Sequence, residues 1–474
     1  MSARIRIPTN LEALDRDELL RLVVRLGGVL DKMYEEIEAL RRAGKRQASP
    51  FSKGRKPGTH KRPGRKAGQG EFKHREPPAR AEVTEEEVAE PPDCCPNCGA
   101  DDLEVEFEDL FITDLPERPR PLVKRVRRAI CNCRKCNRRW RVAHPDVAPN
   151  QHGATAHRLG PRAAAIASIL HYTMGIPVRK VPEIMWELAG IRITQSALTQ
   201  DALRRADSGP LLERYGEIGK AIQQAGAVHA DGTGWKKAGA PAWLIVFATP
   251  STDKKPGETL YVVRDHHSAE VILEVLGKDF AGVLITDRGI EFDAKVLEHL
   301  RKQKCCIHIH RTIKEILRDK HNAARDFGEG LLLLLLEARR LQRDWKAGRR
   351  DNYSETVARL EDRLTVHLRP RTLTDPDNQR LLNEIGKQHD RGSVLRFLHE
   401  PGLPSDNNTA EQQIRFAVIA RKVSHCSKNE RGAHAHAVHS SVGQTERRRK
   451  PPSLLNAVVG YFRRRTADAR PQAP

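Results

Sequence analysis

The order of apolar segments between residues 226 and 308 restricts the fold of this chain more than any other feature of the sequence. The residue period changes along this region, from the alternation of a strand to the 3.6-residue repeat of a helix. Three extended segments come first, and a helix, a strand, a second helix and a last strand follow. We expect strands at residues 227–231, 243–249, 259–263, 282–287 and 305–308, and helices at 268–276 and 292–300.

This order predicts which strands are neighbours. A right-handed crossover from the third strand carries the chain past the first strand, so the fourth strand should pair with the first at the centre of the sheet. The arrangement resembles the ribonuclease H-like fold. Asp231 and Asp287 end the first and fourth strands and would lie close together. Two carboxylates there could share divalent cations for an in-line phosphoryl displacement, and carboxylate oxygens suit Mg²⁺ or Mn²⁺.

A third acid is found in the segment Ser-Asp-Asn-Asn-Thr-Ala-Glu at residues 405–411. Asp and Asn favour the N-cap of a helix, and apolar residues at helical spacing follow. Glu411, Arg415 and Lys422 would share one helical face, which places a metal-binding carboxylate beside two phosphate-binding cations. Asp406 lies five residues before Glu411, off that face, and is expected only to cap the helix.

The charge balance indicates a nucleic-acid partner. The 474 residues have a formal net charge of +21, and 38% of them are hydrophobic. An excess this large and clustered indicates a polyanion, most commonly nucleic acid. The apolar runs are too short for a membrane-spanning helix, and the N-terminus lacks the apolar core of a secretion signal. We therefore expect a cytosolic protein without a membrane partner.

Residues 41–80 contain fourteen lysines and arginines and two acids. A segment this polar cannot bury enough apolar surface to offset the entropy of ordering it, so we expect a flexible basic arm. The side chains expected to bind DNA phosphates are Lys61, Arg62, Arg65 and Lys66. A merely solvated linker is the alternative. Cationic runs at residues 447–450 and 463–465 are expected to extend the basic surface.

Two Cys-x-x-Cys pairs predict a zinc site. Cys95 and Cys98 form the first pair, and Cys133 and Cys136 form the second. Each turn can present two thiolates to one Zn²⁺, and short strands between the pairs suit a zinc ribbon. Four thiolates leave no open position, so this zinc would be structural. Cys94 and Cys131 are alternative ligands with poorer spacing.

Two further regions are expected to be helical. Residues 15–42 carry apolar residues at alternating spacings of four and three, which indicates a coiled-coil dimer contact or a plain amphipathic helix. Residues 178–188 and 194–206 flank a turn at Gly190 and resemble a helix-turn-helix. A small helical bundle satisfies the same pattern.

Cysteine and histidine also gather at residues 305–310, as Cys305, Cys306, His308 and His310. Alternate residues of a strand point to opposite sides, so on the expected strand these side chains would not converge on a metal ion. We expect them to support the fold or to face DNA.

Three motifs resemble those of transposases of the insertion sequence 66 family. They are Asp231-Gly-Thr-Gly-Trp235, Cys306-Ile-His308-Ile-His-Arg311 and Asp406-Asn-Asn-Thr-Ala-Glu411-Gln-Gln-Ile-Arg415. The resemblance extends to the N-terminal helix, the basic arm and the cysteine pairs, so it covers most of the chain.

The resemblance implies that Asp231, Asp287 and Glu411 form a DDE site for Mg²⁺ or Mn²⁺, with a helical insertion between the second and third acids. Arg311, Arg415 and Lys422 are expected to bind DNA. The sequence departs from the family pattern at two places: Gly232 replaces the usual acid after Asp231, and Asp-Arg-Gly at residues 287–289 replaces the more common Asp-Gly-Tyr. Asp293 is the alternative second acid.

The expected fold class is α/β, a ribonuclease H-like catalytic core with a helical insertion, preceded by a coiled-coil helix, a zinc ribbon and a helical DNA-binding region. The expected domains are a coiled-coil helix (1–45), a basic arm (46–90), a zinc ribbon (91–150), a helical region (151–225), the first part of the core (226–311), the insertion (312–404) and the last core helix with a basic tail (405–474).

The resulting hypothesis is a DNA transposase that cleaves strands at transposon ends and joins them to target DNA, with structural Zn²⁺ and catalytic Mg²⁺. Its partners would be terminal inverted repeats, target DNA and further copies of the chain, in a dimer or higher assembly. We expect it in the bacterial cytoplasm, associated with the nucleoid when it binds DNA. The alternatives are a zinc-ribbon DNA-binding regulator with an inactive core and a structure-specific nuclease on the same fold.

Overall fold

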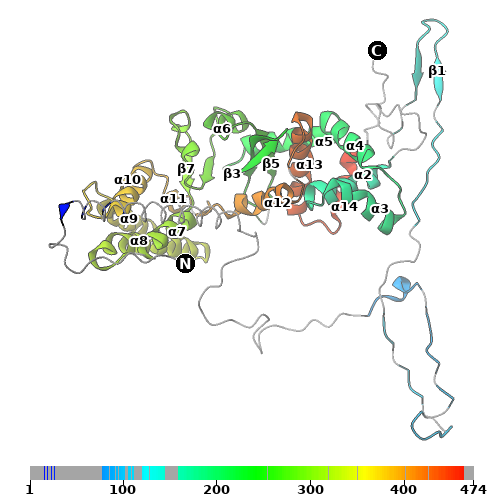
Figure 1. The fold of residues 1–474 in the computed structure, drawn as a ribbon, viewed down its shortest axis with the longest axis horizontal. Helices are drawn as coiled ribbons and strands as arrows, with labels where there is room; N and C mark the ends of the chain where they lie inside the picture. Colours follow the sequence, from blue (N-terminus) through cyan, green and yellow to red (C-terminus); the bar gives the residue numbers. More distant parts are fainter. Residues whose placement is uncertain are drawn as a thin grey trace. The chain divides into compact units, whose positions relative to one another are not determined.

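A computed structural model describes most of residues 159–463 and part of the chain before them (Figure 1). In the C-terminal part the exceptions are residues 253, 254, 319, 350, 401 and 425. Before residue 159 the described positions are 15, 16, 19, 23, 26, 77–84, 86–90, 92–93, 96–101, 105–107, 109–111, 120–127, 129–142 and 144. The chain divides into two compact units, Met1–Asp114 and Leu115–Pro474.

Only scattered residues of the first unit are described. The Leu19 N–H donates to the Asp15 carbonyl at 3.0 Å, as in a helix, but most of the proposed heptad lies outside the described residues. The arm residues Lys61, Arg62, Arg65 and Lys66 also lie outside them. The coiled coil and the arm therefore stay predictions.

The centre of the second unit is a five-stranded mixed sheet in the order β5-β4-β3-β6-β7. Its strands are β3 (Ala227–Lys237), β4 (Ala240–Ala248), β5 (Thr259–Arg264), β6 (Val283–Thr286) and β7 (Arg301–Lys304). The β3, β4 and β5 strands form an antiparallel meander, whereas β6 runs parallel to β3 and β7 parallel to β6. His229 lies opposite Ile285, so the predicted pairing of the first and fourth strands is confirmed.

Two predicted elements were wrong. Residues 292–300 do not form an α-helix but two short 3₁₀ turns, Ile290–Asp293 and Lys295–Leu297. The last strand is β7, and residues 305–308 lead instead into helix α7 (Cys306–Arg318). The sequence of β7 is Arg-Lys-Gln-Lys, which no apolar pattern reveals. This polar strand is buried because other segments supply partners, including the Val394 carbonyl that accepts from Gln303 Nε2 at 2.9 Å.

Alternation along β3 assigns the two faces of the sheet. Val228 and Ala230 pack into a core with helices α5 (Pro210–Gln223) and α6 (Ala269–Leu276). Trp235 packs on the other face, in a core with helix α12 (Asn408–Ser424). Since residues two apart point to the same side of a strand, Asp231 lies on the face that α12 covers.

Helix α13 (Glu430–Arg448) covers the edge strand β5. The Thr259 N–H donates to Thr445 Oγ1 at 2.9 Å, and the Tyr261 N–H donates to Ser441 Oγ at 2.8 Å. These hydroxyls satisfy backbone donors that an open sheet edge would leave available for pairing with another chain.

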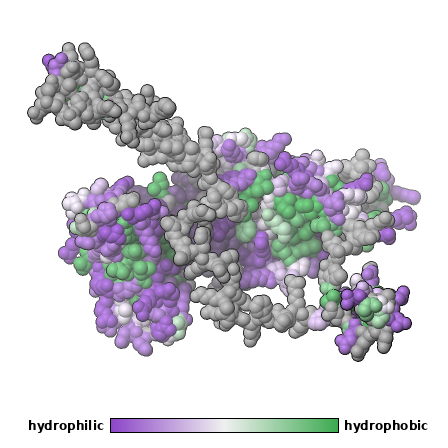
Figure 2. Space-filling model, turned by 60° about the horizontal axis from the view of Figure 1, so that its bottom comes forward, coloured by the Kyte–Doolittle hydropathy of each residue, from purple (hydrophilic) through white to green (hydrophobic). Residues whose placement is uncertain are grey.

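Between β7 and α12, four further helices follow α7. They are α8 (Asp326–Lys346), α9 (Tyr353–His367), α10 (Pro376–Asp390) and α11 (Arg396–His399). Their apolar faces share a core with Val283 and Ile285 of β6, so the insertion is anchored to the sheet. Hydrophilic residues cover most of its surface on the face drawn in Figure 2.

The helices before the sheet agree with the expected pattern. They are α2 (Pro161–Ser168), a π-helical turn (Ile169–Thr173), a 3₁₀ turn (Val178–Lys180), α3 (Val181–Ala189) and α4 (Gln195–Asp207). Gly190 ends α3 with a φ of 61°, a left-handed conformation that favours glycine. Thr194 caps α4 by accepting from the Ala197 N–H at 3.2 Å. DNA contact by α4 stays a prediction.

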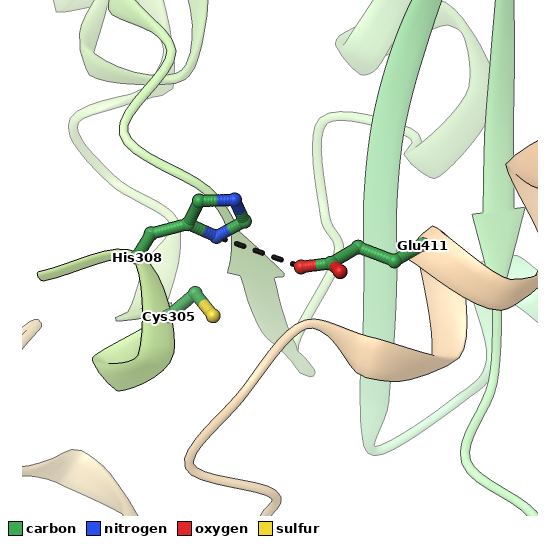
Figure 3. A group of neighbouring side chains, drawn as sticks. All are labelled: Cys305, His308 and Glu411. Carbon is green, nitrogen blue, oxygen red and sulfur yellow. Dashed lines mark ion pairs between the residues drawn. The ribbon is translucent and has the colours of Figure 1, made fainter. Parts of the chain in front are cut away.

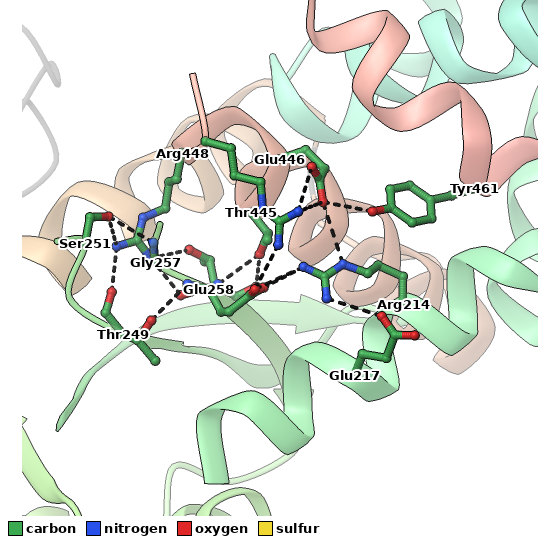
Figure 4. A network of polar contacts seen from close by, with 12 residues as sticks. Arg214, Glu217, Thr249, Ser251, Gly257, Glu258, Thr445, Glu446, Arg448 and Tyr461 are labelled. Atoms are coloured by element: carbon green, nitrogen blue, oxygen red, sulfur yellow. Dashed lines mark hydrogen bonds and ion pairs between the residues drawn. The ribbon is translucent and has the colours of Figure 1, made fainter. Parts of the chain in front are cut away.

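The cationic run at residues 447–450 does not simply extend a basic surface, as we had expected. Arg448 donates to the backbone carbonyls of Glu258 and Thr249, each at 2.6 Å (Figure 4). Arg449 donates to Glu258 Oε1 at 3.0 Å, and Arg214 donates to Glu258 Oε2 at 2.9 Å. These arginines join the end of α13 to α5 and to the connection between β4 and β5.

We expect Arg448→Ala to lower the free energy of unfolding by about 3 kcal/mol, because two carbonyl groups lose a charged donor. Chemical denaturation measures the change. Lys220→Ala is the matched control, since it removes one positive charge from an exposed position of α5. Equal effects of the two variants would contradict a structural role for Arg448.

Candidate active site

Three acids from separate parts of the chain meet at the centre of the sheet. Asp231 lies on β3, Asp287 directly follows β6, and Glu411 lies in the first turn of α12. Burial and the charges of Asp287, Glu411 and Glu291 together raise the pKa of Asp231 to about 7. The Gly232 N–H, which donates to Asp231 Oδ1 at 2.8 Å, acts in the opposite direction. The site is therefore a half-buried concentration of negative charge.

Asp287 and Asp293, the two candidates for the second acid, have different surroundings. The negative charge of Asp287 raises the pKa of Asp231, and Asp287 Oδ1 accepts from the Gly289 N–H at 2.9 Å. Asp293 Oδ1 instead lies 2.9 Å from Nζ of the fully buried Lys304. Its Oδ2 accepts from Gln388 Nε2 at 2.8 Å. Asp293 thus neutralises a buried cation and ties the 3₁₀ turn to β7 and α10.

The space beside Gly232 is occupied by the side chain of His267. A Cβ atom at Gly232 would lie 2.6 Å from Cε1 of His267. The His267 ring stacks on Trp243 with centroids 4.9 Å apart, and its Nδ1 lies 3.3 Å from Glu291 Oε1. His267 therefore occupies the space of a side chain at position 232, and Glu291 supplies an additional negative charge. Neither His267 nor Glu291 stands in a motif that marks it as part of a site in the sequence.

Asn407 links the strand of the first acid to the helix of the third. Its Nδ2 donates to the Ala230 carbonyl at 2.9 Å, and its Oδ1 lies 3.1 Å from His229 Nδ1. Burial lowers the pKa of His229 to about 4, so at neutral pH the ring is uncharged and Nδ1–H can donate to this amide. The Asn407 carbonyl accepts from the Glu411 N–H at 3.1 Å. Sequence reasoning had treated this asparagine only as part of a helix-cap motif.

The hypothesis drawn from the sequence, that the three acids hold divalent cations for DNA cleavage, makes a prediction for Asn407. Under it, Asn407→Ala should reduce DNA cleavage by about 10–100-fold, the usual effect of losing a residue that orients a metal ligand. The variant should also need more divalent cation to reach its maximal rate, which a purely structural defect would not explain. A titration of cleavage rate against Mg²⁺ measures this shift. Asn408→Ala is the matched control, because Asn408 is the exposed neighbouring position. An unchanged Mg²⁺ requirement in Asn407→Ala would contradict the positioning role.

A cysteine, a histidine and the third acid form a second group beside the carboxylates (Figure 3). Cys305 precedes α7, His308 lies one turn later on the same face, and both point toward Glu411. One donor atom from each of the three lies within 4.8 Å of the other two. The expectation that Cys305, Cys306, His308 and His310 would not converge was wrong for Cys305 and His308, because it assumed a strand. Cys306 points away, into the core of the insertion.

Of the cationic residues predicted to bind DNA, those of the arm lie outside the described residues, whereas those of the core are described. Arg311, Arg415 and Lys422 are exposed, and within the described part of the chain none of the three pairs with an acid. Arg421, which was not predicted, donates to Thr233 Oγ1 at 3.0 Å and thus fastens α12 to β3.

Half of the proposed zinc ribbon is described. Strands β1 (Ile130–Asn132) and β2 (Arg139–Arg141) form a hairpin, and Cys133 and Cys136 lie in its turn. The Cys136 backbone N–H and side chain lower the pKa of Cys133 by hydrogen bonding to its sulfur. Cys98 belongs to the other unit, and Cys94 and Cys95 lie outside the described residues. The four-cysteine site stays a prediction.

Fold and site together define a mixed α/β protein whose central sheet carries a cluster of acidic side chains. A family model described as the IS66 family of transposases matches residues 157–435, more than half of the chain. The chain therefore belongs to the IS66 family of transposases. A comparison with curated proteins found no match. Among the described residues, no helix is long and apolar enough to cross a membrane.

Proposed function

We propose that this protein is a DDE-type transposase that cleaves DNA strands at transposon ends and joins the resulting 3′ hydroxyls to target DNA. The observation that carries the proposal is the gathering of Asp231 within β3, Asp287 directly after β6 and Glu411 in the first turn of α12. The strand order β5-β4-β3-β6-β7 supports a ribonuclease H-like core. Membership of a transposase family implies DNA as the partner.

The donor set fits divalent cations. The three acids offer carboxylate oxygens, which Mg²⁺ and Mn²⁺ prefer, and Oε1 of Glu411 is buried without a hydrogen-bond partner. The mutual repulsion that raises the pKa of Asp231 is also what a bound cation would relieve. Bound cations would stabilise the charge on the attacking and leaving oxygens of the phosphoryl transfer. We assign Asp231, Asp287 and Glu411 as their ligands.

Other residues of the chain support this chemistry. Arg415 and Lys422 lie on α12, C-terminal to Glu411, and are proposed to bind DNA phosphates. Asn407 holds the start of α12 against β3, so that Glu411 stays near Asp231. The basic arm, the zinc ribbon and assembly of several copies on DNA remain parts of the proposal.

Two assays on the full-length protein test the proposal. The first measures nicking of supercoiled DNA with and without Mg²⁺, and the second measures joining of a transposon-end oligonucleotide to a plasmid. A transposase is expected to give metal-dependent cleavage and joined products. Cleavage without joining would assign a structure-specific nuclease. DNA binding without cleavage under any metal condition would assign a regulator with an inactive core.

A further inference from the structure

Cys305, His308 and Glu411 point toward one another (Figure 3), and their donor atoms lie within 4.8 Å of one another. His308 Nδ1 lies 3.6 Å from Glu411 Oε1, which is too far for a normal hydrogen bond. Both atoms are buried and have no hydrogen-bond partner. Buried polar atoms without partners are rare, and two that face each other across such a gap indicate a ligand between them.

The chemistry of the three donors selects the ligand. A thiolate, an imidazole and a carboxylate are the side chains that bind Zn²⁺, whereas Mg²⁺ does not take sulfur. Zinc bonds of about 2.0–2.1 Å to nitrogen and oxygen in a tetrahedron place those two ligand atoms ~3.3 Å apart, close to the observed separation of 3.6 Å. Three protein ligands leave the fourth position for water.

Surrounding contacts hold the ligands in place. The Cys305 N–H donates to the Thr286 carbonyl at 2.8 Å, next to Asp287. Burial raises the pKa of the Cys305 thiol, and the Asn407 N–H, which donates to Cys305 Sγ at 3.2 Å, acts in the opposite direction. His308 lies three residues after Cys305, so the helix places both side chains on one face.

We propose that Cys305, His308 and Glu411 bind one zinc-type transition-metal ion, at a site separate from the four-cysteine ribbon. The ion binds Oε1 of Glu411, an oxygen that is also proposed as a ligand of the catalytic cation. Zinc at this position therefore competes with the magnesium-dependent reaction. The binding site stands without the proposed function, whereas the inhibition rests on it.

The binding test uses the full-length chain equilibrated with Zn²⁺, desalted and analysed for zinc per chain. Cys305→Ser and His308→Gln are each expected to lose one equivalent relative to the unaltered protein and to bind zinc more than about 100-fold more weakly, since even outer-shell changes cost 10–100-fold. Cys426→Ser, a cysteine outside the group, is the matched control and should retain the full amount. Thermal melts establish that each variant is folded. Unchanged zinc content in both Cys305→Ser and His308→Gln would overturn the proposal.

The second readout is cleavage at fixed Mg²⁺ with increasing Zn²⁺. Inhibition is expected in the unaltered protein, and more than about 100-fold more zinc should be needed for the same inhibition of Cys305→Ser, in line with its weaker binding. Equal inhibition of both proteins would overturn the competition. Absence of cleavage in every protein would contradict the proposed function but leave the zinc stoichiometry as an independent result.

Discussion

Asp231→Asn and Glu411→Gln are each expected to lower DNA cleavage and joining by more than about 100-fold while DNA binding stays nearly unchanged. Both substitutions keep the shape of the side chain and remove the charge that is proposed to hold a divalent cation. The loss should exceed the 10–100-fold effect of altering a residue that only orients a metal ligand. Rates of plasmid nicking and strand joining measure the first effect, and a gel-shift titration measures DNA binding.

Asp406→Asn is the matched control for the third acid. Asp406 Oδ1 accepts from the Asn408 N–H at 3.2 Å, so it acts in the turn that starts α12, and an asparagine side chain can accept in the same way. Cleavage by this variant should stay within a few-fold of the unaltered protein. If Asp406→Asn loses cleavage and Glu411→Gln keeps it, Glu411 is not the third acid.

Asp287→Asn and Asp293→Asn are expected to fail in different ways. Asp287→Asn should lose cleavage by more than about 100-fold with little change in stability, because its carboxylate faces the charged site. Asp293→Asn should lower the free energy of unfolding by about 3 kcal/mol, because it leaves the buried ammonium of Lys304 without its acidic partner. Nicking assays and chemical denaturation, run on both variants, separate the two effects.

A double substitution tests whether the stability lost in Asp293→Asn is due to the unpaired charge of Lys304. Combining Asp293→Asn with Lys304→Met removes both members of the buried pair and should restore part of the lost stability, since no charge is left unpaired. Cleavage by a folded Asp293→Asn protein should stay close to normal. If that folded protein is inactive while Asp287→Asn cleaves DNA, the second acid has been assigned to the wrong residue.

The parts of the fold that sequence reasoning predicted well have strong periodic signals. The first four residues of β3 and the residues of β6 form short, mainly apolar runs, and the pairing between these strands followed from the handedness of the crossover. The continuation of β3 to Lys237 was not predicted. The acids were found because each stands at the end of such a segment or just inside a helix. The turn at Gly190 was found because a glycine directly after a helical pattern is a specific signal for the end of a helix.

The missed elements depend on contacts between distant segments. Strand β7 is polar in sequence and buried in the fold, because Asp293, Val394 and other partners satisfy its side chains. Its position could not be read from hydrophobic alternation, which placed the strand four residues too late. That displacement also turned a helix start into a strand and hid the convergence of Cys305 with His308.

By itself, the sequence determined the class of the protein: a basic chain with acids at the ends of paired strands and motifs that resemble those of a transposase family. Local periodicity and spacing are enough for such conclusions, since they depend on neighbouring residues. Only the tertiary structure decided that Asn407 fastens α12 to β3, that His267 fills the space at Gly232, and that Asp293 neutralises Lys304. Those roles depend on contacts between segments that are far apart in sequence. A local sequence pattern does not predict which distant side chain a residue will contact.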